Sequence, residues 1–368
     1  MVEEQNCKNI INENDILNNN YWSFLKDNAI KFRVPFHGHF ELTPLCNFNC
    51  KMCYIHLLPE QLNGKDIMRF NQWKKIIDDA YEAGMLFCSL TGGECLTHPD
   101  FDDIYCYLKK KGIIVFILTN GFLLKEKMQL FEKFPPALIQ VSLYGDNENV
   151  YKKVTGVDGY KKVMDSIENA IDKKLKISIA LTTNKYFKNI EKILRHFKEK
   201  NISVQSNDFL MNARSNTCRD INDIRLSIDE SIEVSRTFYR VLYGHMPEKY
   251  KGNLPSINNN INIYSPKGIS CVAGRCEFLI NWYGEMAMCV ALSEPVGNIN
   301  HENFIDVWEK VVKRADEFSM PVECFGCEYH KVCVSCPASH LINAEPGHCN
   351  KDICREGYNL VKEGIKSL

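Results

Sequence analysis

Short apolar runs alternate with longer amphipathic stretches through the first two hundred residues of the chain. The apolar runs predict six strands, at residues 40–42, 86–90, 114–118, 138–143, 177–181 and 203–207. Apolar residues spaced three and four positions apart predict helices between them, near residues 70–83, 101–111, 124–134, 160–173 and 187–200. Strands and helices that alternate in this order form a parallel sheet with the helices outside it. The pattern therefore predicts an α/β fold, and six strands rather than eight indicate a partial, open barrel.

The regions around this barrel differ from it in composition. Residues 1–38 are polar and rich in asparagine, with one amphipathic stretch at 21–32, and are predicted to form an N-terminal extension. The barrel is predicted to occupy residues 39–225, and a bridging region to follow at 226–264. Residues 265–368 are cysteine-rich and have too few apolar residues for a core of their own. We expect this last part to need metal to hold it together.

Charge and cysteine content narrow the class of protein. The 45 basic and 46 acidic residues balance, which argues against a nucleic-acid or acidic-membrane surface. The longest apolar stretch, residues 113–118, is far too short to span a bilayer, and the N-terminus has no apolar signal core. We therefore predict a cytoplasmic protein. In that reducing compartment, 17 cysteines in clusters favour metal–thiolate sites over disulfides.

Three cysteines in one short loop, directly after the first predicted strand, are the most informative residues of the chain. Cys46, Cys50 and Cys53 form a C-x3-C-x2-C cluster. A 4Fe–4S cluster is normally held by four thiolates, so three of them leave one iron open for a ligand that is not protein. The alternative is a zinc site, for which His56 could supply a fourth ligand at close range.

This spacing, followed by Tyr54, resembles the radical SAM superfamily, and the resemblance extends over residues 40–368. It implies that Cys46, Cys50 and Cys53 hold the catalytic cluster and that the open iron binds S-adenosylmethionine. It also implies that an electron from the cluster cleaves this cofactor, and that a 5′-deoxyadenosyl radical then removes a hydrogen from the substrate. The implied fold is a partial, TIM-like (β/α)6 barrel with its chemistry at the carboxyl ends of the strands.

Residues at the ends of later strands match elements that bind the cofactor in the resembled family. The turn at 91–94, Thr-Gly-Gly-Glu, resembles the element that holds the methionine amino group, with Glu94 as its carboxylate. The resemblance places Ser142 against the ribose or the carboxylate and Tyr54 by the adenine. Asn120 either caps a turn or lies near the ribose. The implied cofactor-binding residues are Tyr54, Thr91, Gly92, Gly93, Glu94, Asn120, Ser142, Leu210 and Met211.

Three positions depart from the family's pattern. Cys95 stands where many relatives have proline, Tyr144 where many have aspartate, and Thr155 where many have arginine. Which residue holds the carboxylate of the cofactor is therefore left open. Cys95 could pack in the core or return a hydrogen atom to a substrate radical, and packing is the commoner role of such a cysteine.

The C-terminal cysteines resemble the SPASM extension, which in that family binds two auxiliary 4Fe–4S clusters. The implied ligands are Cys271, Cys276, Cys289 and Cys336 for one cluster, and Cys324, Cys327, Cys333 and Cys354 for the other. Two residues separate Cys333 from Cys336 where relatives have three, and Cys349 competes with Cys354. A zinc ribbon is the alternative, because paired C-x2-C elements are also a zinc spacing.

The resemblance implies an oxygen-sensitive enzyme with three 4Fe–4S clusters and S-adenosylmethionine as cofactors. Its main expected function is to modify a ribosomally synthesised peptide, by a thioether or carbon–carbon crosslink or by residue oxidation. Val290 stands where sulfatase-maturing relatives have a catalytic aspartate, which argues against that activity. The alternatives are a radical SAM dehydrogenase for a small molecule and, outside enzymes, an iron–sulfur electron carrier or a zinc-stabilised binding module.

Two partners are expected beside the precursor peptide. The first is a low-potential electron donor of the flavodoxin or ferredoxin type. The second depends on residues 1–38, which are too few for the winged peptide-recognition domain of many maturases. Either a separate protein delivers the peptide, or the barrel and bridging region bind it themselves.

Overall fold

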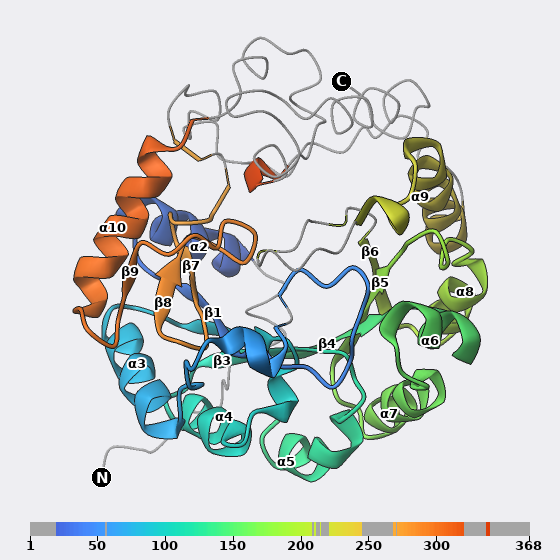
Figure 1. The fold of residues 1–368 in the computed structure, drawn as a ribbon, viewed down its shortest axis with the longest axis horizontal. Helices are drawn as coiled ribbons and strands as arrows, with labels where there is room; N and C mark the ends of the chain where they lie inside the picture. Colours follow the sequence, from blue (N-terminus) through green and yellow to red (C-terminus); the bar gives the residue numbers. More distant parts are fainter. Residues whose placement is uncertain are drawn as a thin grey trace, which may run out of the picture.

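One curved sheet of nine strands runs through the part of the chain that the structure describes (Figure 1). The structure is a computed structural model and describes residues 20–55, 57–207, 210, 214, 221–244, 268–269, 271–319 and 336–338. The strand order is β6-β5-β4-β3-β2-β1-β7-β8-β9, parallel from β6 to β7 and antiparallel beyond. The strands are β1 (His37–Thr43), β2 (Phe87–Gly92), β3 (Ile114–Thr119), β4 (Leu138–Leu143), β5 (Ile177–Thr182), β6 (Ser203–Asn207), β7 (Glu277–Ile280), β8 (Glu285–Ala287) and β9 (Gly297–Asn298).

The six predicted strands are confirmed as β1 to β6, and with them the partial barrel. Only β1 is clearly longer than predicted, because it begins with the polar sequence His37-Gly38-His39. Alternate residues of β1 point to opposite faces of the sheet. Phe40 packs against Trp73, with ring centroids 5.1 Å apart, so it faces the outer helices. His37, His39 and Glu41 therefore face the inside of the barrel.

Helices cover the outer face of the sheet, as the alternating pattern predicts (Figure 1). Each buries one apolar face; in the helix after β1 this face is Trp73, Ile76, Ile77 and Ala80. Within the described residues, every helix is too short or too polar to cross a bilayer. The helices around the barrel are α3 (Phe70–Glu82), α4 (Phe101–Lys110), α5 (Met128–Lys133), α6 (Glu148–Thr155), α7 (Tyr160–Asp172), α8 (Glu191–Glu199) and α9 (Ile228–Tyr243).

Two predicted helices differ from the structure in their bounds. The segment predicted at 124–134 divides into a 3-10 turn, η3 (Leu124–Lys127), followed by α5. The helix predicted from residue 187 begins only at Glu191. Asn184 causes this delay, because its side-chain oxygen accepts hydrogen bonds from the Tyr186 and Phe187 amides, at 3.0 and 3.2 Å, and holds a turn.

Helix α6 was not predicted, because eight residues are too few to show helical periodicity. Its ends nevertheless carry cap signals. Asn147 accepts a hydrogen bond from the Val150 amide at 3.0 Å, and Gly156 ends the helix in the left-handed conformation.

The amphipathic stretch predicted before the barrel is confirmed as α2 (Asn20–Phe32). It packs on the first residues of the strands, where Ala29 and Ile30 join Phe36, Phe87 and Ile114 in a small second core. The rest of the described barrel shares one large core. The amino ends of the central strands are thus covered by α2.

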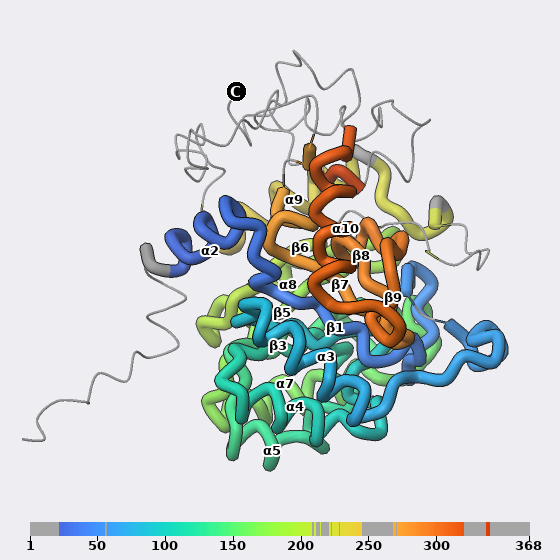
Figure 2. Tube along the Cα trace, turned by 90° about the vertical axis from the view of Figure 1, so that its left-hand side faces the viewer, coloured from blue at the N-terminus to red at the C-terminus, as the bar shows by residue number. Residues whose placement is uncertain are grey.

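The described part of the C-terminal region packs into the core of the barrel and has no core of its own, as predicted, while its dependence on metal stays a prediction. β7 pairs with β1, and α10 (Phe304–Glu317) lies beside them (Figure 2). Phe278 of β7 contacts Phe304 and Trp308 of α10, with ring centroids 5.5 and 5.9 Å apart. The predicted domain bounds stay a prediction, although the sheet continues across the one at residue 265.

Candidate active site

The cysteine loop begins three residues after β1, at the carboxyl end of the sheet. Backbone hydrogen bonds join it to the end of α6: the Asn49 amide donates to the Thr155 carbonyl at 2.9 Å, and the Lys51 amide donates to Val154 at 3.0 Å. Within the loop, the Cys53 amide donates to the Cys50 carbonyl at 3.1 Å. Backbone hydrogen bonds therefore fix the loop to the end of α6.

The sulfur atom of Cys46 lies among hydrogen-bond donors. The Phe48 amide and the Asn120 side-chain amide approach it at 3.3 and 3.6 Å. Burial raises the pKa of the free thiol to about 12. Donors aimed at a ligand sulfur stabilise its thiolate when metal binds, so this environment fits an iron–sulfur ligand. His56, the alternative zinc ligand, lies outside the described residues.

The two glycines of the 91–94 turn admit the chain that leads into the cysteine loop. The Gly93 amide donates to the Thr43 carbonyl at 2.7 Å, and the Glu94 amide donates to Leu45 at 3.0 Å. A Cβ at Gly93 would collide with the Leu45 carbonyl, and Gly92 has a φ of 128°. The sequence argument assigned the glycines to close approach of a ligand, whereas here they allow close approach of the backbone.

Glu94 is buried and links this turn to the end of β3. Its carboxylate accepts hydrogen bonds from the Thr119 hydroxyl at 2.8 Å, the Asn120 amide at 2.7 Å and the Leu96 amide at 3.1 Å. Burial nevertheless raises the pKa of this carboxyl. Asn120 also donates to the Asn47 side chain at 2.8 Å, so the structure brings Glu94, Asn120 and the cysteine loop together.

Glu94→Gln is expected to weaken binding of S-adenosylmethionine by about ten- to a hundred-fold, the effect of a charge-assisted hydrogen bond of roughly 1.5–3 kcal/mol. It should also lower stability, because glutamine has one acceptor oxygen for donors that now use two. Thr119→Val is the matched control, since it removes one donor and keeps the carboxylate. Calorimetric binding that is unchanged in Glu94→Gln would show that Glu94 acts only on the fold.

The end of β4 brings an aromatic group to the cysteine loop. Ser142 is half-buried on this strand and hydrogen-bonds the Tyr144 side chain. Phe48 of the loop packs against both Tyr144 and Tyr151, with ring centroids 6.4 and 5.9 Å away, and these two tyrosine rings also contact each other. Thr155 is fully buried and donates to the Tyr151 carbonyl at 2.8 Å, so it has a structural role where relatives have arginine.

The remaining predicted positions divide between buried and undescribed residues. Cys95 is fully buried, and its thiol lies 3.4 Å from the Leu118 carbonyl, which supports packing over hydrogen transfer. The Leu210 carbonyl accepts a hydrogen bond from the Arg225 guanidinium at 2.6 Å. Met211 lies outside the described residues.

Arg214 is the central residue that sequence reasoning missed. Its guanidinium lies 2.8 Å from the buried Glu41 carboxylate, and its carbon is 5.2 Å from the centre of the Tyr54 ring. It also donates to the Val290 carbonyl, next to Cys289. Arg214 therefore joins β1, the residue after the cysteine loop and the C-terminal region. No local motif marks it, because its partners are distant in sequence.

Four C-terminal cysteines lie near one another. Burial, together with the neighbouring Cys289 and Cys336, raises the pKa of Cys271 to about 11. Burial raises the pKa of Cys276 to about 12, with Cys271 among the neighbours that contribute, and the Leu292 amide donates to the Cys289 sulfur at 3.2 Å. This is the set assigned to one auxiliary cluster, and the assignment stays a prediction. Cys324, Cys327, Cys333, Cys349 and Cys354 lie outside the described residues.

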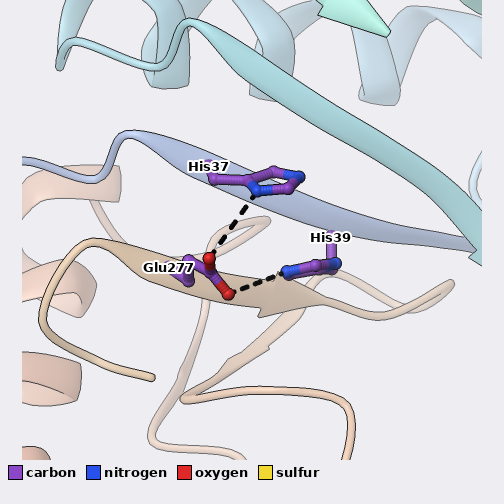
Figure 3. A group of neighbouring side chains, drawn as sticks. All are labelled: His37, His39 and Glu277. Atoms are coloured by element: carbon purple, nitrogen blue, oxygen red, sulfur yellow. Dashed lines mark hydrogen bonds and ion pairs between the residues drawn. The ribbon is translucent and has the colours of Figure 1, made fainter. Parts of the chain in front are cut away.

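At the amino end of β1, two histidines meet a glutamate of β7 (Figure 3). Glu277 lies 3.8 Å from His37 Nδ1 and 3.3 Å from His39 Nε2. Burial lowers the pKa of His37 to about 3, whereas the hydrogen bond from His39 offsets burial and lowers the pKa of Glu277. This group binds β7 to β1 at the end of β1 away from the cysteine loop.

Two family models match the chain in the regions of its two cysteine groups. Residues 40–197 match the radical SAM superfamily. Residues 271–337 match SPASM, an iron–sulfur cluster-binding domain. The first match takes in the cysteine loop, the 91–94 turn and β4, and the second takes in the four neighbouring C-terminal cysteines.

Similar proteins include biosynthetic enzymes. The chain is 27% identical over 352 residues to the antilisterial bacteriocin subtilosin biosynthesis protein AlbA of Bacillus subtilis (strain 168). This match covers 92% of the chain and 75% of AlbA. It is 25% identical over 319 residues to AdoMet-dependent heme synthase of Methanosarcina barkeri, with coverages of 81% and 90%. The crystal structure of Streptococcus suis SuiB bound to S-adenosylmethionine shares the fold, with a TM-score of 0.66 and 16% identity over 92% of this chain and 83% of that chain.

Proposed function

We propose that this chain, which is a radical SAM protein with a C-terminal SPASM domain, abstracts a hydrogen from a ribosomally synthesised peptide and installs a post-translational modification in it. The observation that carries this proposal is the match to AlbA, a bacteriocin biosynthesis protein, over 92% of the chain. The peptide reading is further supported by SuiB, which has also been solved with its precursor peptide SuiA.

The residues of the site can be assigned separate roles in this chemistry. When bound, a 4Fe–4S cluster and S-adenosylmethionine supply the 5′-deoxyadenosyl radical that takes the hydrogen atom. Cys46, Cys50 and Cys53 would hold the cluster, and Glu94 would hold the methionine amino group. Asn120 would fix the loop against that carboxylate. The remaining contacts to the cofactor are assigned to Tyr54, Thr91, Gly92, Gly93, Ser142, Leu210 and Met211.

The C-terminal cysteines would complete a set of three clusters. Cys271, Cys276, Cys289 and Cys336 are assigned to one auxiliary cluster, and Cys324, Cys327, Cys333 and Cys354 to the other. The neighbourhood of the first four cysteines supports that set. Such clusters survive best in the reducing cytoplasm of a cell that grows without oxygen.

Cys289→Ala is expected to leave uncoupled formation of 5′-deoxyadenosine and to abolish the modified peptide, because its thiol belongs to the second cysteine group and not to the loop. Product analysis by liquid chromatography and mass spectrometry measures both. Metal ligands also stabilise folds, so circular dichroism must show a folded variant. Cys106→Ala, on α4, is the matched control. A folded variant that lacks this cluster and makes product at the wild-type rate would refute the assigned role.

The proposed function is tested with the short peptides encoded beside the gene. Each is synthesised with deuterium at its side-chain carbons and incubated anaerobically with the reconstituted protein, dithionite and S-adenosylmethionine. Transfer of deuterium into 5′-deoxyadenosine, with a mass change in the peptide, is the expected result. Formation of 5′-deoxyadenosine that no such peptide changes or accelerates would contradict a peptide substrate.

One observation favours a small-molecule dehydrogenase as the second candidate. The match to AdoMet-dependent heme synthase covers 90% of that protein. Deuterium transfer from a small molecule rather than a peptide would support this candidate. AlbA matches over more of this chain at higher identity, so a peptide substrate is the preferred hypothesis.

The proposed reaction needs a one-electron donor, which we assign to a low-potential protein of the flavodoxin or ferredoxin type. Peptide delivery is a separate matter. Either a second protein brings the peptide, or the barrel and bridging region bind it directly. Pull-down of the precursor peptide by the purified chain alone would distinguish these two arrangements.

A further inference from the structure

A basic pocket of about 590 Å³ opens beside the cysteine loop. Its lining includes Lys51 of the loop, Lys152 and Lys153 of α6, and Asp223 as an opposing charge. The chain as a whole has a net charge of −1, so this excess of lysines is local. Such a local field attracts acidic surfaces.

Two of these lysines pack near an aromatic ring and form no ion pair with the residues that the structure describes. The ammonium groups of Lys51 and Lys153 lie 5.4 and 3.9 Å from the centre of the Tyr186 ring. Within the described part of the chain, neither forms an ion pair. Lys152 does, with Asp158 at 2.6 Å, but both of these side chains are largely exposed. The pocket therefore keeps positive charge available to a partner.

The wall of the pocket is the cysteine loop itself. Asn49 and Lys51 line it, and they flank Cys50 in the chain. The backbone hydrogen bonds from these two residues to Thr155 and Val154 fix the loop to the lysine-bearing end of α6. The pocket is therefore built on the same loop as Cys50, a proposed ligand of the catalytic cluster.

We propose that this pocket is the docking site of an acidic one-electron carrier that reduces the cluster held by the cysteine loop. The proposal rests on the function proposed above, and it assigns the entry point of the electron. The carrier loses one electron and the cluster gains it, and no bond is made or broken. Opposite charges on the two surfaces would raise the rate of encounter and orient the carrier toward the loop.

The test is anaerobic stopped-flow reduction of the reconstituted protein by reduced flavodoxin, which is an acidic carrier. The loss of cluster absorption measures the rate of reduction. Lys152→Glu with Lys153→Glu reverses two charges of the pocket. We expect the second-order rate constant at low salt to fall by about ten- to a hundred-fold, and to depend less on salt than the wild-type value. Lys75→Glu with Lys110→Glu, on exposed positions of α3 and α4, makes the same change in net charge and should keep the wild-type rate.

Dithionite separates the failure of this proposal from that of the proposed function. Small-molecule reduction and iron content should be the same in both variants and the wild type. A flavodoxin rate that is unchanged in the pocket variant, or lowered equally in the control, would overturn the docking site. Loss of peptide binding with an unchanged flavodoxin rate would overturn it too, and would assign the pocket to substrate. If dithionite yields no 5′-deoxyadenosine from wild-type protein, the proposed function itself fails.

Discussion

Replacing Cys46, Cys50 and Cys53 together by alanine should remove about four of roughly twelve irons and all cleavage of S-adenosylmethionine. These cysteines belong to the loop that follows β1. The Phe48 amide and the Asn120 side-chain amide approach the Cys46 sulfur. Iron analysis and 5′-deoxyadenosine formation, both after anaerobic reconstitution, measure the two losses.

Cys88→Ala is the matched control for this variant, because Cys88 is fully buried in the core of the barrel. It should keep its irons and its cleavage activity, even if the smaller side chain lowers stability. One equivalent of zinc and no iron in anaerobically purified wild-type protein would contradict the radical SAM assignment of the loop.

Arg214→Met is expected to lower the free energy of unfolding by about 3–5 kcal/mol, because removing one partner of a buried ion pair leaves the other charge uncompensated. The Glu41 side chain is only 2% exposed, and Arg214 is 20% exposed. Burial already raises the pKa of Glu41 in spite of the guanidinium. Thermal unfolding, followed anaerobically by circular dichroism, should shift down by roughly 6–10 °C at about 2 °C per kcal/mol.

The double variant Arg214→Met with Glu41→Leu separates the ion pair from the packing around it. It removes both charges, so it should recover most of the lost stability. A double variant as unstable as Arg214→Met would show that the contacts to Tyr54 and Val290 matter more than the charge of Glu41.

The fold was largely predictable because its apolar pattern is local. β2 to β5 are mostly apolar, as is typical of buried parallel strands, and such segments can be recognised in the sequence, whereas β6 is polar apart from Val204. β7 was not predicted, since its four residues are stabilised by distant partners, β1 and α10 among them. The described C-terminal residues have no core of their own, as predicted, because the apolar residues of α10 are buried in the barrel's core; the dependence of this region on metal stays a prediction.

The candidate site was predictable where its residues belong to a motif. The cysteine loop and the 91–94 turn have fixed spacings, and the structure brings them together through the Thr43 and Leu45 carbonyls. Arg214 has no such spacing, because it meets Glu41 and Val290 from sequence separations of 173 and 76 residues. The lysines of the pocket were also missed, since Lys152 and Lys153 are indistinguishable in sequence from the solvated basic residues common at helix ends, and Lys51 belongs to no basic cluster.

The pairing of β1 with β7 bears on the order in which the chain folds during synthesis. His39 and Glu277 meet across 238 positions of sequence. At about 5–20 residues per second, a ribosome needs roughly 10–50 s to synthesise β7 after β1. During that interval the β1 side of the nascent sheet is an open edge that can pair with other chains. A chain arrested before residue 277 would keep this edge and should aggregate. The late synthesis of β7 therefore covers the exposed edge of the barrel.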